Sequence, residues 1–358
     1  MNVEQQSSPS GTEGADEVVT ALEAADRAEA EGRLLDAIDA LQRANRLATD
    51  PDLERRLVRL RGEAPRQFDP GAGRDHWPPH YPDLFQVEAG ALPEIEASAL
   101  TTEVLGSGIT HHGALLVRGL FTPALVEQFV DGIDRAFDAF DRAVGGTPPS
   151  KTAPWYIPFQ PSIALEDPFL PRRFVRAGGG VWFADSPHMM FELADLFERT
   201  GLRDIIAGYL GERPATSVKK CTLRRVPIDS QRRFHQDGAF MGQDLRTVNT
   251  WIALSECGGD SSPVPALDVV PRRFDDYVET GGFPPPFTDF VSDEVTERVA
   301  AGVGITRPRF SPGDALLFDD LLLHATYTRP DMIGERYAIE AWFFAPSHIP
   351  ADQSPLAF

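Results

Sequence analysis

Cysteine is scarce in this chain of 358 residues, which contains only Cys221 and Cys257. Two cysteines cannot supply the disulfide framework of a small secreted domain, and they are compatible with a reducing compartment. Basic residues are also few, with 34 Lys and Arg against 54 Asp and Glu, which gives a formal net charge of −20 at pH 7. This charge argues against nucleic acid and against anionic membrane surfaces as partners.

Long apolar runs are missing as well. No stretch approaches the length that spans a membrane, and no apolar segment typical of a signal peptide follows the N-terminus. The sequence therefore predicts a cytoplasmic protein. The remaining composition, 42% hydrophobic and 25% charged, is that of a globular protein. The length indicates about two domains.

The N-terminal quarter has an organisation of its own. We expect a disordered tail at 1–13, a helical extension at 14–62, a proline-rich linker at 63–93 and the main domain at 94–350. Gly32 and Asp50-Pro51 divide the extension into three helices. The pattern from Gly32 to Ala44 resembles half of a tetratricopeptide repeat, but one unit cannot bury its own face. A helical extension packed on the main domain or on a dimer partner is favoured over a peptide-binding adaptor.

The first half of the main domain shows one clear strand and helix. Residues 113–120 predict a strand, and Thr122-Pro123 predicts the start of a helix with an amphipathic stripe. Residues 145–189 are irregular and rich in Pro, Gly and aromatics, so they are either a lid over a substrate or surface packing. A single helix is expected from Met189 to Leu210, ending at Gly211.

A histidine and an aspartate, His235 and Asp237, lie two residues apart in the second half. On a strand, such positions point to the same face. Two histidines and one carboxylate form the ligand set that suits non-haem Fe(II), and His324 is the best candidate for the third ligand. The alternative is that all three are structural polar residues.

An arginine follows in a segment that predicts a buried strand. Arg336 begins the run Arg336–Phe344, which is rich in aromatic and aliphatic residues. A buried arginine needs an anionic partner, and a guanidinium is a natural clamp for a carboxylate. Arg329 is the rival for this role, but Pro330 places it in a turn.

These features together resemble the phytanoyl-CoA dioxygenase family of Fe(II)- and 2-oxoglutarate-dependent oxygenases. The resemblance covers about residues 85–346 and is carried by the segments His235–Asp237, Thr250–Leu254, Asp268–Pro271 and Ser311–Phe318, with His324 and Arg336. It implies a mainly β fold with surrounding helices and a double-stranded β-helix (jelly-roll, cupin-like) core. It also implies that Fe(II) is held by His235, Asp237 and His324, with 2-oxoglutarate and O₂ as cosubstrates.

The resemblance assigns further residues to the cosubstrate. It implies that Arg336 and Thr326 bind the far carboxylate of 2-oxoglutarate, that Trp251 forms an aromatic wall, and that Thr222 supplies a polar contact. Lys219 and Lys220 are alternatives to Thr222, and a core tryptophan is an equally good interpretation of Trp251.

Two segments bear on the substrate and on rival ligands. The family usually ends one strand with Pro-Gly-Ser-His, whereas this chain has Pro271-Arg272-Arg273-Phe274. This departure predicts a more cationic rim if both arginines face the mouth. Asp319 and Asp320 are expected to be solvated acids in a turn and not metal ligands.

The favoured function is hydroxylation of a small-molecule substrate with release of succinate and CO₂. Two other classes stay open. One is a metal-dependent cupin-type enzyme that does not use 2-oxoglutarate. The other is an interaction protein that binds its partner through the N-terminal helices.

Overall fold

The protein is described from a computed structural model that covers residues 11–69, 73–160, 169–231, 233–242, 244–283, 288–350 and 353–358. The helices are α1 (Gly11–Ala30), α2 (Leu34–Leu47), α3 (Pro51–Glu63), α4 (Thr102–His112), α5 (Pro123–Val144), α6 (Pro149–Thr152), α7 (Leu170–Ala177), α8 (Pro187–Arg199), α9 (Leu202–Leu210), α10 (Gly238–Met241) and α11 (Asp293–Val299). The strands are β1 (Glu94–Glu96), β2 (Ala114–Arg118), β3 (Gly180–Trp182), β4 (Ala215–Ser217), β5 (Thr222–Val226), β6 (Thr247–Ala253), β7 (Ala266–Val269), β8 (Ala315–Phe318), β9 (His324–Tyr327), β10 (Arg336–Phe344) and β11 (Pro355–Ala357).

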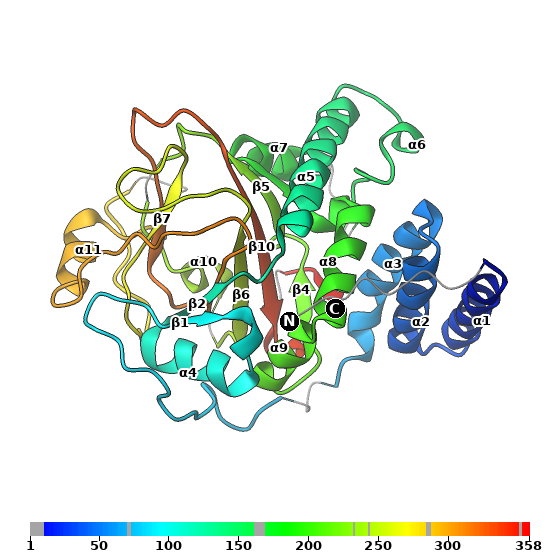
Figure 1. Cartoon of the computed structure of the whole chain (residues 1–358), viewed down its shortest axis with the longest axis horizontal. Coiled ribbons are helices and arrows are strands. Elements are labelled where there is room, and N and C mark those ends of the chain that lie inside the picture. The colour runs from blue at the N-terminus through cyan, green and yellow to red at the C-terminus, as the bar shows by residue number, and fades with distance from the viewer. Residues whose placement is uncertain are drawn as a thin grey trace.

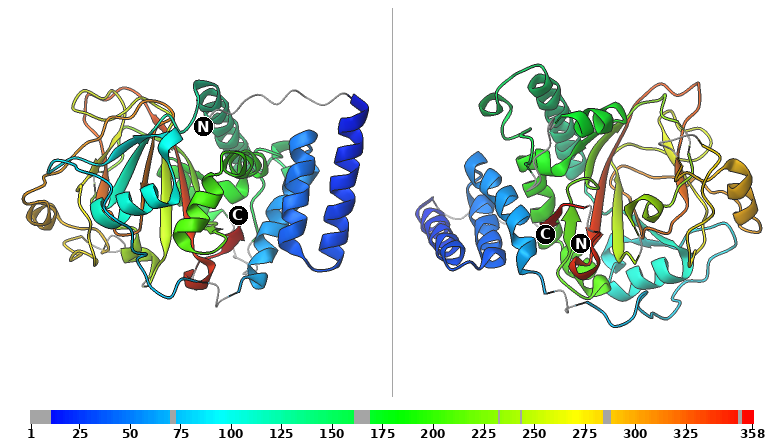
Figure 2. Two further views of the ribbon diagram at one scale, coloured as in Figure 1. Left: turned by 60° about the horizontal axis from the view of Figure 1, so that its bottom comes forward. Right: turned by 180° about the vertical axis from the view of Figure 1, so that it is seen from behind.

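The N-terminal helices α1, α2 and α3 lie side by side on one flank of the molecule (Figures 1 and 2). Gly32 turns the chain between α1 and α2 with a φ of 75°. The Asp50 side chain accepts a hydrogen bond from the Asp52 N–H and caps α3, whose first residue is Pro51. The three expected helices are therefore present. The first of them begins at Gly11, within the segment expected to be a tail, and residues 1–10 of that tail lie outside the described residues.

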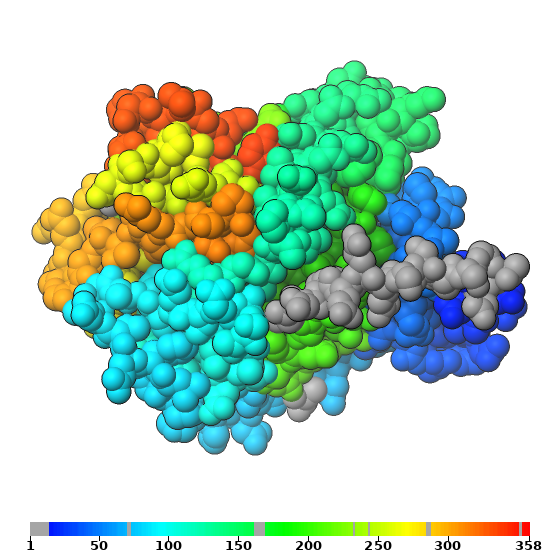
Figure 3. Space-filling view, in the orientation of Figure 1, coloured from blue at the N-terminus to red at the C-terminus, as the bar shows by residue number. Residues whose placement is uncertain are grey.

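The extension packs closely on the rest of the chain. Helix α3 contacts α8 and β11, and Phe191 of α8 shares a buried apolar cluster with α1, α2 and α3. Polar contacts cross the same interface: the His188 Nδ1 lies 2.7 Å from Glu54 Oε1, and the Arg61 guanidinium donates to the Ala357 carbonyl at 2.8 Å. Figure 3 shows these helices projecting from the side of the molecule opposite to residues 255–330.

A mixed nine-stranded sheet forms the centre of the main domain. Its strands run in the order β1-β2-β8-β6-β10-β4-β11, and β5 pairs with both β10 and β3. A second sheet contains β7 and β9. This arrangement is consistent with a jelly-roll type of fold. Helices hold more of the described residues than strands do, so the expected mainly β character applies to the core alone.

The two faces of the central sheet have different surroundings. On one face Phe343 packs against Phe197 of α8, and the Tyr337 hydroxyl donates to Asp134 of α5 at 2.8 Å. On the other face Phe318 contacts both Trp342 of β10 and His324 of β9, with ring centroids 5.8 and 5.2 Å apart. The second sheet therefore covers the face that the helices leave free, and an interior lies between the two sheets (Figure 1).

Two expectations about the helical part need correction. The predicted helix from Met189 to Leu210 is two helices, α8 and α9, because Gly201 adopts a φ of 73° and separates them. The segment 145–189 is not one irregular loop, since it contains α6, α7 and β3. The contacts of Trp155 with Arg135 and His188, and of Tyr156 with Phe140, place it against α5 and α8. These contacts favour surface packing over a lid, and residues 161–168 lie outside the described residues.

No helix among the described residues has both the length and the apolar composition needed to cross a membrane.

Candidate metal centre

His235 and His324 are brought together by backbone pairing. The two residues form an isolated antiparallel bridge in which each N–H donates to the carbonyl of the other, at 3.0 and 3.1 Å. Directly paired residues of antiparallel strands project their side chains to the same side. The two imidazole rings consequently lie with their centroids 4.4 Å apart.

Asp237 joins the two histidines from the end of a short helix. It is the residue before α10, with φ −60° and ψ −31°, so it does not continue a strand as the spacing suggested. Its carboxylate still converges on the imidazoles, because one ligand atom from each of His235, Asp237 and His324 lies within 4.8 Å of the others. Among the described residues these three form the only group of His, Cys, Asp or Glu that could hold a metal ion.

Hydrogen bonds fix the tautomers of both histidines. His235 Nδ1 lies 3.0 Å from the Arg233 carbonyl, and His324 Nδ1 lies 3.0 Å from the Leu322 carbonyl. A carbonyl oxygen can only accept, so each Nδ1 carries a proton, and in the neutral ring the lone pair is then on Nε2. This arrangement is typical of metal-binding histidines, whose second ring nitrogen is held by a backbone carbonyl.

The protonation states also suit a metal. Burial, together with the neighbouring His324, lowers the pKa of His235 to about 4. Burial alone would raise the pKa of Asp237, but the Lys220 ammonium and the two imidazoles lower it to about 2. At neutral pH the site therefore offers neutral imidazole and an ionised carboxylate, the forms in which these groups bind metals.

Lys220 is the cation closest to this carboxylate. Its Nζ lies 3.0 Å from Asp237 Oδ1 and 4.0 Å from the centre of the Phe240 ring. Thr222, which the family resemblance placed at the cosubstrate, instead donates its hydroxyl hydrogen to Glu340 Oε2 at 2.7 Å. Of the polar residues considered for this strand, Lys220 is thus the one placed at the candidate metal centre.

The loop that carries the ligands is supported from behind. Gln236, the residue between His235 and Asp237, is buried. Its side chain donates to the Leu321 carbonyl at 2.7 Å and accepts from the Val278 N–H at 2.6 Å. The Gly238 N–H donates to the Asp320 carbonyl at 3.1 Å. A Cβ at Gly238 would clash with the Tyr277 ring and hydroxyl and with the Asp320 carboxylate, so a larger residue here would displace these side chains.

Asp319 and Asp320 are buried, which contradicts the expectation of solvated acids. Asp320 accepts hydrogen bonds from the Thr247 hydroxyl at 2.9 Å and from the Tyr277 hydroxyl at 3.0 Å. Asp319 pairs with Arg273. Arg273 is therefore engaged in the protein and does not add charge to a rim. Sequence analysis could not predict this burial, because the partners of both acids lie in distant segments of the chain.

Arg336 lies deeper in the same interior. Its side chain is 1% exposed, and one Nη donates to the Ala266 carbonyl at 3.0 Å. The Nε has no hydrogen-bond partner, and no carboxylate of the described residues lies within ion-pair distance of the guanidinium. Burial lowers its pKa to about 10, so it stays charged at neutral pH. A buried guanidinium without an anion is costly, which indicates a binding site for one.

Trp251 lies beside this guanidinium, and Thr326 lies on the strand of His324. The Arg336 guanidinium carbon lies 5.2 Å from the centre of the Trp251 ring, and the Trp251 Nε1 is buried without a partner. Thr326 is two residues beyond His324 on β9 and so faces the same side. Arg329, the rival of Arg336, pairs with Asp331 and donates to the Ser262 carbonyl.

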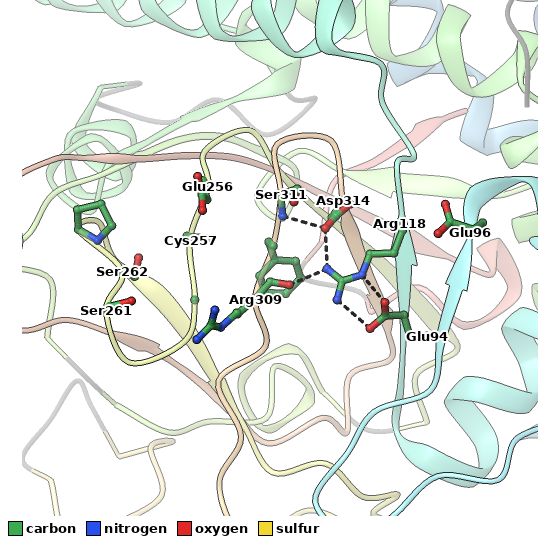
Figure 4. A pocket seen from close by; sticks show the side chains of 13 residues that line it. Glu94, Glu96, Arg118, Glu256, Cys257, Ser261, Ser262, Arg309, Ser311 and Asp314 are labelled. Carbon is green, nitrogen blue, oxygen red and sulfur yellow. Dashed lines mark hydrogen bonds and ion pairs between the residues drawn. The ribbon is translucent and has the colours of Figure 1, made fainter.

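A sizeable cavity of the described residues lies elsewhere. It has a volume of about 570 Å³ and surrounds Arg118 at the β1–β2 edge (Figure 4). Arg118 is fully engaged there, because it pairs with Glu94 at 2.8 Å and Asp314 at 2.7 Å and donates to the Arg309 carbonyl. This cavity is polar, open and without an unpaired buried group of its own. We assign the chemistry to the interior between the sheets.

Comparisons with known proteins give weak likenesses only. No family model and no curated protein matches the chain. Among solved structures, EvdO2 from Micromonospora carbonacea var. aurantiaca in complex with 2-oxoglutarate is 15% identical with a TM-score of 0.43, covering 69% of this chain and 89% of that one. EctD from S. alaskensis with 2-oxoglutarate and 5-hydroxyectoine is 17% identical with a TM-score of 0.43, covering 75% and 87%. The non-heme alpha ketoglutarate dependent carbocyclase SnoK from nogalamycin biosynthesis is 13% identical with a TM-score of 0.43, covering 71% and 87%.

Proposed function

We propose that this protein is an Fe(II)- and 2-oxoglutarate-dependent oxygenase that hydroxylates a small molecule. The observation that carries the proposal is the combination of two features in one interior. These are a cluster of two imidazoles and one carboxylate whose ligand atoms lie within 4.8 Å of one another, and a buried guanidinium that has no carboxylate of the described residues as a partner.

His235, Asp237 and His324 would hold the metal. Two nitrogen ligands and one oxygen ligand on one side of an octahedral ion leave the opposite positions open, which is the arrangement of non-haem Fe(II) oxygenases. Bound iron would supply the activation of O₂, coupled to the conversion of 2-oxoglutarate into succinate and CO₂. Lys220 would keep the Asp237 carboxylate ionised and hold one of its oxygens in place.

Arg336 would bind the far carboxylate of 2-oxoglutarate, with the Thr326 hydroxyl as a second donor and Trp251 as the wall of the pocket. The free Nε of Arg336 fits this role, because a carboxylate takes two parallel N–H donors from one guanidinium. Phe240, Phe290 and Phe318 lie within 6 Å of the imidazole centroids and would limit access of water to the metal.

The strand pairing is compatible with a double-stranded β-helix, which we include in the proposal. One sheet contains β5, β10, β6 and β8 in this spatial order. On the other side the chain at 234–235 bridges to residues 291 and 324, β9 pairs with β7, and Val269 bridges to Thr306. A double-stranded β-helix requires four neighbouring segments on each side, and the pairing gives four strands on one side and five paired segments on the other.

The proposal is tested by anaerobic Fe(II) titration of the protein followed by an assay of succinate with and without O₂. The wild type should bind one Fe(II) and form succinate only when Fe(II), 2-oxoglutarate and O₂ are all present. His235→Ala should lose both properties, whereas His111→Ala, an exposed histidine of α4, should keep them. Metal binding without any dependence of turnover on 2-oxoglutarate would instead identify a cupin-type enzyme of another class.

A further inference from the structure

The interior face of β5 and β10 carries a second arginine. Arg224 of β5 lies opposite Ala338 of β10, on the side of the sheet that also bears Thr222, Glu340 and Arg336. Its neighbour Arg225 points to the opposite face, where it contacts Asp134 of α5 at 3.0 Å and Glu335 at 3.1 Å. Two consecutive arginines thus have different surroundings, one in the interior and one against the helices.

The donors of Arg224 are largely unused. Its Nε lies 3.3 Å from Glu340 Oε1, which balances the charge, but it has no hydrogen-bond partner. Within the described part of the chain, no side-chain hydrogen bond from Arg224 is found. The Glu340 carboxylate is itself held by the Thr222 hydroxyl. The side chains of Arg224 and Glu340 are 20% and 25% exposed, so both are partly accessible, whereas Arg336 is 1% exposed.

The Arg224 guanidinium lies close to a glycine of the edge strand. Gly180 of β3 is the residue opposite Arg224, and a Cβ there would lie 3.2 Å from Arg224 Nη1. The guanidinium therefore lies beside β3, on the face of the sheet that also bears Arg336. Arg224 is thus a second cation next to the site proposed for the cosubstrate.

The charge of this interior exceeds what the cosubstrate can neutralise. Among the described residues, three cations, Lys220, Arg224 and Arg336, face two carboxylates, Asp237 and Glu340. A divalent metal brings two positive charges and 2-oxoglutarate brings two negative ones. Within this set of groups one positive charge stays uncompensated, in a protein whose formal net charge is −20, and such a set attracts a further anion.

We propose that Arg224, positioned by Glu340, binds an anionic group of the substrate, and that the substrate is a small molecule that carries a carboxylate. This inference rests on the proposed function, since it assumes that Arg336 is occupied by 2-oxoglutarate. The residue sets substrate specificity and takes no part in binding the metal.

Calorimetry with the full chain tests the inference without relying on turnover. The protein is loaded with Mn(II) and saturating 2-oxoglutarate and titrated with benzoate, benzamide, butyrate, butyramide and phenyl phosphate. The wild type should bind each carboxylate about tenfold or more tightly than its amide, the usual effect of a charge-assisted hydrogen bond. A preference for phenyl phosphate over both carboxylates would overturn the carboxylate assignment.

Three variants locate the preference. Arg224→Gln should abolish the discrimination between acid and amide, and Arg225→Gln, one residue along on the opposite face, should leave it unchanged. Glu340→Gln should tighten carboxylate binding, because it removes the competing anion and keeps an acceptor for Thr222. This variant tests the inference by a gain, which a misfolded protein cannot produce.

Several results would overturn the inference. They are a wild type that binds no carboxylate more tightly than its amide, a preference that survives Arg224→Gln, and an Arg224→Gln variant whose main defect is weaker binding of 2-oxoglutarate. Titration of 2-oxoglutarate into the Mn(II)-loaded wild type is done first. Failure at that step contradicts the proposed function itself, whereas failure only with the benzoate and butyrate pairs contradicts this inference alone.

Discussion

Buried arginines occur in two regions of the molecule, and they are neutralised in different ways. Where α7 meets β3, Arg172 makes two contacts with the Asp185 carboxylate, at 2.6 and 2.8 Å, and both side chains are at most 2% exposed. In the interior between the sheets, Arg336 is equally buried, donates to a carbonyl and lies beside an aromatic ring, and no carboxylate of the described residues lies within ion-pair distance of it. Burial therefore does not distinguish the two arginines. They differ in that Arg172 has a carboxylate partner, whereas Arg336 has none among the described residues.

The same contrast extends to the N-terminal extension. Its buried Glu54 faces His188, and Arg46 lies 2.5 Å from Asp195. These pairs connect α2 and α3 with α8, and in each pair both partners belong to this protein. We therefore regard the extension as part of the folded unit, and the charges at its interface as structural.

The largest effect on stability is expected from breaking the paired arginine. Arg172→Gln would leave the Asp185 carboxylate buried without its counter-charge, which costs about 3–5 kcal/mol for such pairs. Urea unfolding followed by circular dichroism measures this loss. Arg173→Gln, an exposed position on the same helix, is the control and should change the free energy of unfolding by less than about 0.5 kcal/mol. Equal losses of unfolding free energy in the two variants would show that the Arg172–Asp185 pair does not stabilise the fold in this way.

The unpaired arginine should give the reverse pattern. Arg336→Gln should raise the 2-oxoglutarate concentration needed for half-maximal succinate formation by about 100-fold, since it removes two charge-assisted hydrogen bonds. The free energy of unfolding should not fall, because no buried carboxylate loses its partner. A destabilisation as large as that of Arg172→Gln, with 2-oxoglutarate binding intact, would show that Arg336 is structural too.

A smaller effect concerns Asp320, which supports the loop of the metal ligands. Burial, and the neighbouring Asp319 carboxylate, raise its pKa from 3.8 to about 7. An acid whose pKa is raised by folding binds its proton more tightly in the folded state. Its contribution to stability is therefore full below about pH 4 and is lost as the pH rises through 7. Asp320→Asn should flatten the pH dependence of the unfolding free energy between these values.

Urea unfolding of the wild type and Asp320→Asn across this pH range is the measurement. Asn can still accept a hydrogen bond from Thr247 or Tyr277, so the loop should keep its position. An unchanged pH dependence in the variant would mean that Asp320 does not titrate in this range in the folded protein.

Much of the local structure could be predicted from the sequence. The three N-terminal helices and the Thr122 cap of α5 follow from patterns within a few residues, and the structure contains both. The break at Gly201 could not be predicted, because an isolated glycine inside an apolar helical pattern is compatible with either outcome. The sequence also singled out His235, Asp237 and His324 as candidate metal ligands, and the structure brings them together. Asp237, however, reaches the site from the start of a helix and not from a strand.

The residues that sequence analysis missed share one property, which is that their partners are distant in the chain. Asp320 was expected in solvent because its partners Thr247 and Tyr277 lie more than forty residues away. Arg224 and Glu340 had a weaker signal, since each is a charged residue at an inward position of a strand with period two. Only the strand register shows that both face the same interior.

The most direct test of the account is a calorimetric titration of 2-oxoglutarate into the protein with and without Mn(II), under anaerobic conditions. The account predicts binding that requires the metal and that is lost in both Asp237→Ala and Arg336→Gln. Binding that is equally tight without metal, or that survives both substitutions, would contradict it.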